Sequence, residues 1–114
     1  MSKRHRALGV QFDLPADRLR DMVSDEYGVH MDEALDAMRA EWESSNGDPD
    51  KVHSNDHAHG GPDNYIEKLK GDIAQRGVLT PILVRGNAVK EGHHRAVAAL
   101  ALGLRSIPAM ETPR

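Results

Sequence analysis

The most constraining feature of this sequence is the change of pattern at Gly92, where a strand-like segment gives way to a helical one. Ala88 to Glu91 has the short, partly apolar pattern of a strand. Alanine and leucine dominate the residues that follow, up to Leu102, and Gly103 then supplies a helix stop. The sequence therefore predicts a sharp strand-to-helix turn at Gly92.

Two further strands are predicted beside this turn. Ile82 to Val84 is a β-branched and aliphatic run that closes at Arg85, and a tight turn at Gly86-Asn87 joins it to the strand that precedes Gly92. Ile107 to Met110 is predicted to form a short closing strand, in which Pro108 favours an edge or strand-end position.

A helix is predicted ahead of these strands. Asp63 can cap it, and Gly77 is expected to end it in a left-handed conformation. Its apolar face comprises Tyr65, Ile66, Leu69 and Ile73.

The N-terminal half has weaker patterns. A strand is expected from Ala7 to Phe12, and Pro15 then suits the first turn of a helix that runs to about Ser24, with Leu19, Met22 and Val23 at helical spacing. Asp25-Glu26 is expected to be a solvated turn. A second helix is predicted from about Asp32 to Ser44, with an apolar stripe of Met31, Leu35, Met38 and Trp42.

Residues 45 to 64 change composition abruptly. Ser, Asn, Gly, Asp, Pro and His dominate, which predicts a loop of about 20 residues, a length that is usually functional or disordered. We therefore expect an α+β fold, with a small mixed sheet flanked by helices. Residues 1–62 would form an N-terminal strand, a helical extension and the histidine-rich loop, and residues 63–114 the core.

Composition limits the functions that are open to the chain. None of its apolar runs approaches the roughly 20 residues that a membrane-spanning helix needs, which predicts no membrane association. Cysteine is absent, so neither a disulfide framework nor a thiol nucleophile is expected, and a cytoplasmic location follows. The net charge of −3 weighs against a whole-surface grip on nucleic acid.

The turn at Gly92-His93-His94-Arg95 has the residue types that hold a phosphate. The first N–H groups of a helix lack intrahelical acceptors and carry partial positive charge, so an anion there collects several hydrogen bonds. Gly92 lets the backbone approach closely, and Arg95 can add a bidentate contact. His93 and His94 can donate as well, more strongly when protonated. An ordinary strand-to-helix turn with solvated polar residues is the alternative interpretation.

The C-terminal part resembles the ParB/sulfiredoxin-like domain family. The run Gly77-Val78-Leu79-Thr80-Pro81-Ile82-Leu83-Val84 is similar to the segment in ParB partition proteins where a helix ends at glycine and a strand opens at proline-isoleucine. Gly92, Arg95 and Ala98 match the glycine-arginine-alanine frame of the ParB nucleotide-binding turn, and the later helix, Gly103 and closing strand also fit. The resemblance covers about Asp63 to Met110.

The resemblance implies a nucleotide, CTP or ATP with Mg²⁺, or a nucleic-acid phosphate bound at Gly92 to Arg95, with Thr80 and Pro81 also contributing. His93 and His94 stand where ParB has a glutamate and an arginine, a departure that bears on its magnesium-dependent CTP chemistry. Sulfiredoxin's catalytic cysteine would fall at His93, which excludes sulfinic-acid reduction. Because a DNA-reading domain would follow in ParB, the chain is not expected to be a full partition protein. The closest local likeness is to the Asp-Gly-His-x-Arg form of the free-serine kinase and of small phage and mobile-element proteins, with Glu91 in place of the aspartate.

Two further groups of residues could take part in binding a metal ion. His53, His57 and His59 have the residue type that binds a transition metal, with His57 and His59 as the favoured ligands, although their spacing also suits a plain polar loop. Glu91 lies one residue before the turn and could place a carboxylate near a phosphate-bound Mg²⁺.

Three classes of function follow from these residues. The first is a module that binds nucleotide or nucleic-acid phosphate in DNA transactions, in which DNA or a protein partner takes part. The second is a metal-dependent nuclease or a phosphotransferase that uses Glu91, His93 and His94 in catalysis. The third is a noncatalytic interaction protein on the same fold.

Overall fold

A five-stranded mixed sheet forms the framework of the computed structural model, which describes residues 10–112. Its strands are β1 (Gln11–Pro15), β2 (Val23–Ser24), β3 (Ile82–Arg85), β4 (Ala88–Glu91) and β5 (Ser106–Glu111), in the spatial order β1-β5-β3-β4-β2. The β1/β5 and β3/β4 pairs are antiparallel, whereas β3/β5 and β2/β4 are parallel. Both outer strands come from the N-terminal part of the chain. The predicted α+β class is confirmed.

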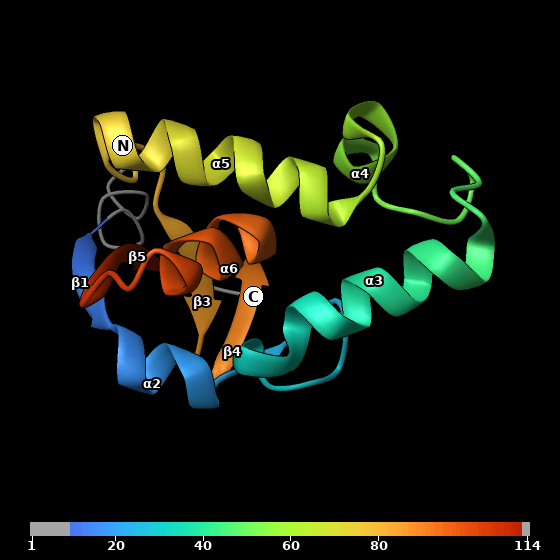
Figure 1. The fold of residues 1–114 in the computed structure, drawn as a ribbon. Coiled ribbons are helices and arrows are strands. Elements are labelled where there is room, and N and C mark those ends of the chain that lie inside the picture. The colour runs from blue at the N-terminus through green and yellow to red at the C-terminus, as the bar shows by residue number, and fades with distance from the viewer. Residues whose placement is uncertain (1–9, 113–114) are drawn as a thin grey trace, which may run out of the picture.

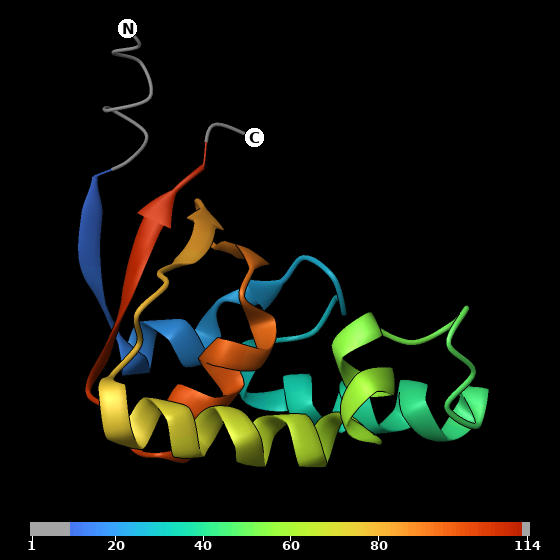
Figure 2. The same cartoon turned by 90° about the horizontal axis from the view of Figure 1, so that it is seen from above.

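Within these residues, five α-helices and a short 3-10 helix accompany the sheet. They are α2 (Ala16–Asp21), η1 (Met31–Glu33), α3 (Ala34–Ser45), α4 (Ser54–His59), α5 (Pro62–Arg76) and α6 (His93–Ala101). Helix α6 lies at the centre, with α5 on one side of it and α2 and α3 on the other (Figure 1). Figure 2 shows α4 and the C-terminal end of α3 at the opposite end of the molecule from β1 and β5.

The core lies where α6 meets its neighbours. Ala96, Ala98 and Ala99 are at most 1% exposed, and such small side chains let α6 approach the elements around it closely. Larger apolar side chains from the sheet and the flanking helices complete the core: Leu14, Leu19, Met22, Met31, Met38, Ile82, Val84, Val89 and Ile107.

The first strand and helix differ from the prediction. Strand β1 starts at Gln11, and residues 7–9 of the predicted strand lie outside the described residues. Helix α2 ends at Asp21 instead of continuing to Ser24, because Val23 pairs with the edge of β4. The Val23 N–H donates to the Asn87 carbonyl oxygen (2.9 Å). Pairing with β4 therefore determines the conformation of Val23, although the spacing of this residue suits a helix.

The predicted loop at residues 45–64 contains regular structure. Helix α4 begins at Ser54, after His53, whose side chain accepts a hydrogen bond from the Asn55 N–H. Helix α5 begins at Pro62 rather than being capped by Asp63, since proline suits the first helical position and the preceding Gly61 takes a φ of 128°. The prediction of an unbroken loop was therefore wrong.

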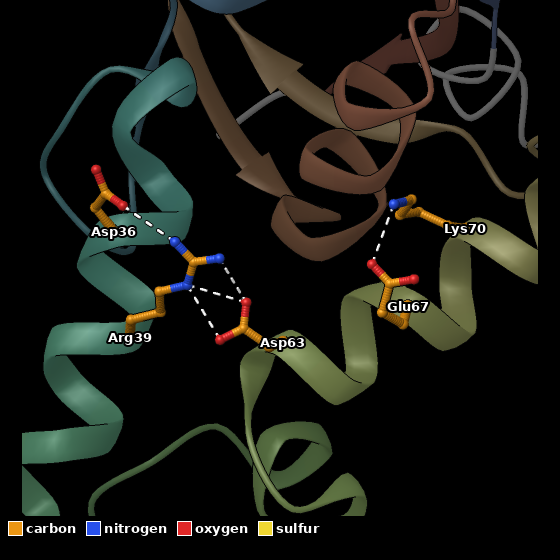
Figure 3. Close-up of polar contacts among 5 residues, drawn as sticks. All are labelled: Asp36, Arg39, Asp63, Glu67 and Lys70. Carbon is orange, nitrogen blue, oxygen red and sulfur yellow. Dashed lines mark hydrogen bonds and ion pairs between the residues drawn. The ribbon is translucent and has the colours of Figure 1, made fainter.

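Asp63 instead links α5 to α3. The Arg39 guanidinium on α3 donates to both carboxylate oxygens of Asp63, with Nη2 2.6 Å from Oδ1, and also contacts Asp36 one turn away (Figure 3). Along α5, Lys70 pairs with Glu67 (3.1 Å). Only the Arg39–Asp63 pair joins the two helices, and because all of these pairs are exposed to solvent, they contribute little stability.

The C-terminal elements follow the prediction closely. The strands β3 and β4 and the helix α6 occupy the expected residues, and Gly103 ends the α6 region with a φ of 75°. Pro108 differs, because β5 lies between β1 and β3 rather than at an edge. One position of an interior strand therefore lacks an N–H donor.

The described part of the chain holds no helix that is both long and apolar enough to cross a membrane.

Two glycines provide a matched test of the predicted end of α5. Gly77 follows the helix with a positive φ of 76°, as predicted, but its ψ of −176° lies outside the left-handed helical region that was expected; Gly71 lies inside the helix. A Cβ added at either glycine would meet no described neighbour within 4 Å. Gly77→Ala is expected to destabilise the fold by about 1–3 kcal/mol through backbone strain. Gly71→Ala should stabilise it by about 0.5–1 kcal/mol. Urea unfolding of both variants measures these opposite changes in the free energy of unfolding. Equal changes in the two variants would contradict the assigned end of α5.

Candidate functional site

A cavity of about 290 Å³ lies at the N-terminus of α6. Four segments that are distant in sequence surround it: the turn after β2, the start of α4, the first turns of α5 and the β4–α6 junction. Its lining residues are Glu26, His53, Asn55, Tyr65, Lys90, Glu91, Gly92, His93, His94 and Arg95. The predicted Gly92-to-Arg95 turn therefore lies in a cavity.

Gly92 is the residue on which the shape of the turn depends. Its φ of 89° and ψ of 28° are left-handed values that favour glycine. A Cβ at this position would lie 2.8 Å from both the Arg95 Nη2 and the Ile82 Cγ2 atoms, which is too close for either. The Ala96 N–H closes the first turn on the Gly92 carbonyl oxygen, so the N–H groups before it have no intrahelical acceptor.

Arg95 supplies positive charge beside these N–H groups. Its Nη2 donates to the Pro81 carbonyl oxygen (3.2 Å), and its Nε is buried without a hydrogen-bond partner. The same side chain lines a second hollow of about 200 Å³, and Thr80 lies there. The structure thus brings Pro81 into contact with Arg95 but places Thr80 outside the main cavity.

The remaining charges at the cavity have mixed signs. Lys90 forms an ion pair with Asp25 (3.0 Å), and Glu91 is exposed at the rim. Glu26 also lines the cavity, although it was predicted to belong to a solvated turn. The turn between β2 and His30 carries it there, because the Asp25 N–H donates to the Val89 carbonyl oxygen (2.9 Å) and so fastens the turn to β4.

His93 is buried and bonded within the protein. Its Nε2 donates to the Val89 carbonyl oxygen (3.1 Å), its Nδ1 lies 3.4 Å from the Glu26 carboxylate, and its ring meets that of Tyr27 edge-on. Burial lowers the pKa of His93, with Glu26 opposing this effect. Burial, and after it the Glu26 charge, raises the pKa of Tyr27. Each ring nitrogen of His93 therefore has a protein oxygen atom close to it.

His94 forms a buried pair with Asp56 of α4. Its Nε2 lies 2.8 Å from the Asp56 Oδ1, and the two side chains are only 6% and 1% exposed. Burial, and after it the neighbouring His53, lowers the pKa of His94 to about 4. Burial also raises the pKa of Asp56, against the opposing effects of His53 and His59. His94 is therefore a neutral imidazole at pH 7.

These contacts bear on the role expected of the two histidines. They were predicted to act as phosphate donors that gain strength when protonated, but the lowered pKa values keep both rings neutral near pH 7. Burial, which one-dimensional patterns do not display, causes the difference. The donors that remain for an anion are the N–H groups of α6 and the side chains of Arg95 and Lys90.

The histidine-rich segment contributes His53 to the cavity, but not His57 or His59, the two that were favoured as metal ligands. His53 and Asn55 line the cavity, whereas His57 is exposed on α4 and the ring of His59 stacks on Tyr65 (4.7 Å). The His59 Nδ1 is 2.9 Å from the Asn55 carbonyl oxygen. His57 and His59 are thus not brought together as ligands. Within residues 10–112 there is no group of three or more His, Cys, Asp or Glu side chains able to hold a metal ion.

Two residues of the site were not predicted from the sequence: Tyr65, which lines the cavity, and Asp56, which pairs with His94. Tyr65 was predicted only as part of the apolar face of α5. The histidine spacing gave a signal that this segment carries a site, but nothing in it identified His94 as the partner of Asp56, 38 residues away. Trp42 lies apart from the cavity, with its ring close to Gly47 and Gly61.

Comparison with known proteins gave no match: no family model fits the chain, and neither a curated protein nor a solved structure is significantly similar to it.

The His94 environment predicts how stability depends on pH. A histidine with a pKa of about 4 when folded and about 6.5 when unfolded takes up a proton preferentially in the unfolded state, so stability falls as the pH drops from 6.5 towards 4. The loss attributable to His94 should reach about 2 kcal/mol at pH 5, from about 1.36 kcal/mol per pH unit. His94→Gln should remove this part of the pH dependence.

Urea unfolding at pH 7, 6 and 5 measures this effect. His57→Gln, at an exposed position of the same segment, is the control and should keep the wild-type slope. If the wild type and His94→Gln lost the same amount of stability between pH 7 and pH 5, this would contradict the lowering of the His94 pKa by burial.

Proposed function

We propose that the chain binds a phosphate-bearing ligand, a nucleotide or a nucleic-acid phosphate, in the cavity at the start of α6. The observation that carries the proposal is that the Gly92-capped first turn of α6 opens into this cavity beside Arg95. Backbone N–H groups at a helix start and a guanidinium are the two donors most suited to a phosphate group.

The charges of the site support the binding of one or a few phosphates. The buried Arg95 Nε has no hydrogen-bond partner, so an anion that reaches it gains an interaction without breaking another. Lys90 can add a second positive charge, while Glu91 at the rim can take part in binding Mg²⁺ that accompanies a nucleotide. The backbone and Arg95 are thus the main phosphate contacts.

We also propose that the chain is a ParB/sulfiredoxin-like domain protein that acts in DNA-related transactions. Support comes from the order of elements from α5 onward, in which a helix ends at Gly77, a strand follows Pro81, and a strand-glycine-helix unit precedes a closing strand. This is the order that the resemblance in the sequence implies. CTP and ATP with Mg²⁺ are the first ligands to test.

Phosphoryl transfer or phosphodiester cleavage is a second candidate function. It is favoured by His94, a neutral imidazole held by a buried carboxylate in the same cavity, because such a group can accept a proton from an attacking hydroxyl or water. Release of phosphate from ATP or CTP, or cleavage of labelled DNA, that is lost in His94→Gln would support it.

Removing Arg95 tests the proposed phosphate site. Arg95→Ala is expected to weaken the binding of ATP or CTP by about 1.5–3 kcal/mol, the range for a hydrogen bond to a charged group. This corresponds to a loss of about tenfold to a hundredfold in affinity. Arg95→Lys should recover only part of it, since the ammonium keeps the charge and loses the planar fork. Fluorescence-anisotropy titration with labelled nucleotide and with short labelled DNA measures both effects.

Arg20→Ala is the matched control, because it removes an exposed arginine of α2 that lies outside the cavity. It should leave affinity unchanged. If Arg95 only stabilises the turn, Arg95→Ala will lower the melting temperature and leave affinity at the wild-type value, and that result would rule the phosphate site out.

A further inference from the structure

One ring nitrogen of His94 is left for a ligand. The Nε2 atom is bonded to Asp56, whereas no hydrogen-bond partner within residues 10–112 contacts Nδ1. The side chain is 6% exposed, and the residue lines the cavity. His94 is therefore anchored on one side and accessible from the cavity.

The hydrogen bond to Asp56 determines which ring nitrogen of His94 carries the hydrogen. His94 is neutral at pH 7, so only one of its two nitrogens bears a hydrogen. The Asp56 carboxylate is an acceptor when it is ionised; burial raises its pKa, and His53 and His59 oppose this rise. The hydrogen then lies on Nε2, where it is donated to Asp56, and Nδ1 keeps its lone pair. Asp56 thus selects a tautomer whose free nitrogen is an acceptor.

An acceptor in this place distinguishes between ligand groups. A lone pair attracts a hydroxyl donor and repels the oxygens of a phosphate, which are themselves acceptors. The N–H groups of α6 and Arg95 suit the phosphate, so two different chemical requirements meet in one cavity.

The size and walls of the cavity agree with a ligand larger than phosphate alone. Its volume of about 290 Å³ is close to the lower end of the range of about 300–1,000 Å³ found for small-molecule sites. The rings of His53 and Tyr65 line the cavity, and each lies 4.9 Å from the His94 ring, tilted to it by 58° and 54° respectively. Aromatic rings that line a cavity can pack against a sugar or a base.

We propose that the ligand is a phosphate ester with a sugar hydroxyl, that His94 Nδ1 accepts a hydrogen bond from this hydroxyl, and that Asp56 is the residue that positions His94. This inference rests on the proposed function and adds the substrate class: ribonucleotides are preferred over polyphosphate and over nucleotides that lack the contacted hydroxyl. Asp56 acts through His94 and does not itself touch the ligand.

Binding measurements with defined probes test the preference. The probes are ATP and CTP, their 2′-deoxy and 3′-deoxy forms, and tripolyphosphate as the ligand without a sugar. Loss of one ordinary hydrogen bond corresponds to about three- to tenfold in affinity. The wild type should therefore bind one of the two deoxy forms about three- to tenfold more weakly than the ribonucleotide.

His94→Gln separates the two nitrogens. The glutamine amide nitrogen can take the place of Nε2 and still donate to Asp56, whereas the ring nitrogen Nδ1 and its lone pair are removed. The variant should bind the ribonucleotide and the deoxynucleotide equally and should still bind tripolyphosphate. Arg95→Ala is the converse control, since it should weaken all probes and keep the preference for the hydroxyl.

The tautomer is measured on the wild-type protein itself. Nitrogen-15 chemical shifts of the His94 ring should show hydrogen on Nε2, and Asp56→Asn should move the population towards the other tautomer and reduce the discrimination. A wild-type ring protonated on Nδ1, or nucleotide binding with no discrimination between ribose and deoxyribose forms, overturns the inference and leaves the phosphate site intact. Failure of every probe to bind overturns both.

Discussion

The hydrogen bond between Asp56 and His94 is the contact on which the arrangement around the cavity depends. It joins α4 to α6 across 38 residues, and both side chains are almost fully buried. A buried polar group that loses its partner costs about 1–3 kcal/mol, so each member of the pair holds the other in place. The segment between α3 and α5 has few apolar side chains of its own, and this bond supplies a specific attachment that the hydrophobic effect cannot.

The same pair explains why the helix start is chemically asymmetric. One side of the cavity offers backbone N–H groups and a guanidinium, and the other offers a neutral imidazole backed by a carboxylate. A protonated His94 would add positive charge to the cavity and would donate at Nδ1 instead of accepting. Burial, by lowering the pKa of His94, keeps the two sides different.

The sequence predicts those parts of the fold that local signals determine. The strands β3 and β4, the turn at Gly92 and the helix α6 follow one another with short connections, so glycines and the apolar pattern locate them well. Strand β2 could not be found in this way, because Val23 joins the sheet only through pairing with β4, which lies 65 residues further on in the register Val23↔Ala88. Pro108 was predicted at an edge or strand end, and its place in an interior strand was missed for a similar reason: the order of strands is a property of the whole sheet.

The candidate site was predicted in part. Gly92 and Arg95 were identified from the chemistry of helix starts, and both line the cavity. The roles of His93 and His94 were not, since a ring's charge and the direction of its hydrogen bonds depend on burial and on partners such as Glu26 and Asp56. Residue types indicate which atoms are available, and only the packing determines where each of them is used.

The pairing of β1 with β5 has a practical consequence for handling the protein. Gln11 lies opposite Met110, so the two ends of the described chain leave the sheet as neighbours, while α4 occupies the far end of the molecule (Figures 1 and 2). Chain that leaves the sheet beside Gln11 or Met110 therefore starts on the side away from α4. A linker that joins β1 to β5 at this point would allow new ends to be cut at the exposed residues 49–51 between α3 and α4, which would give a circular permutant with the same sheet.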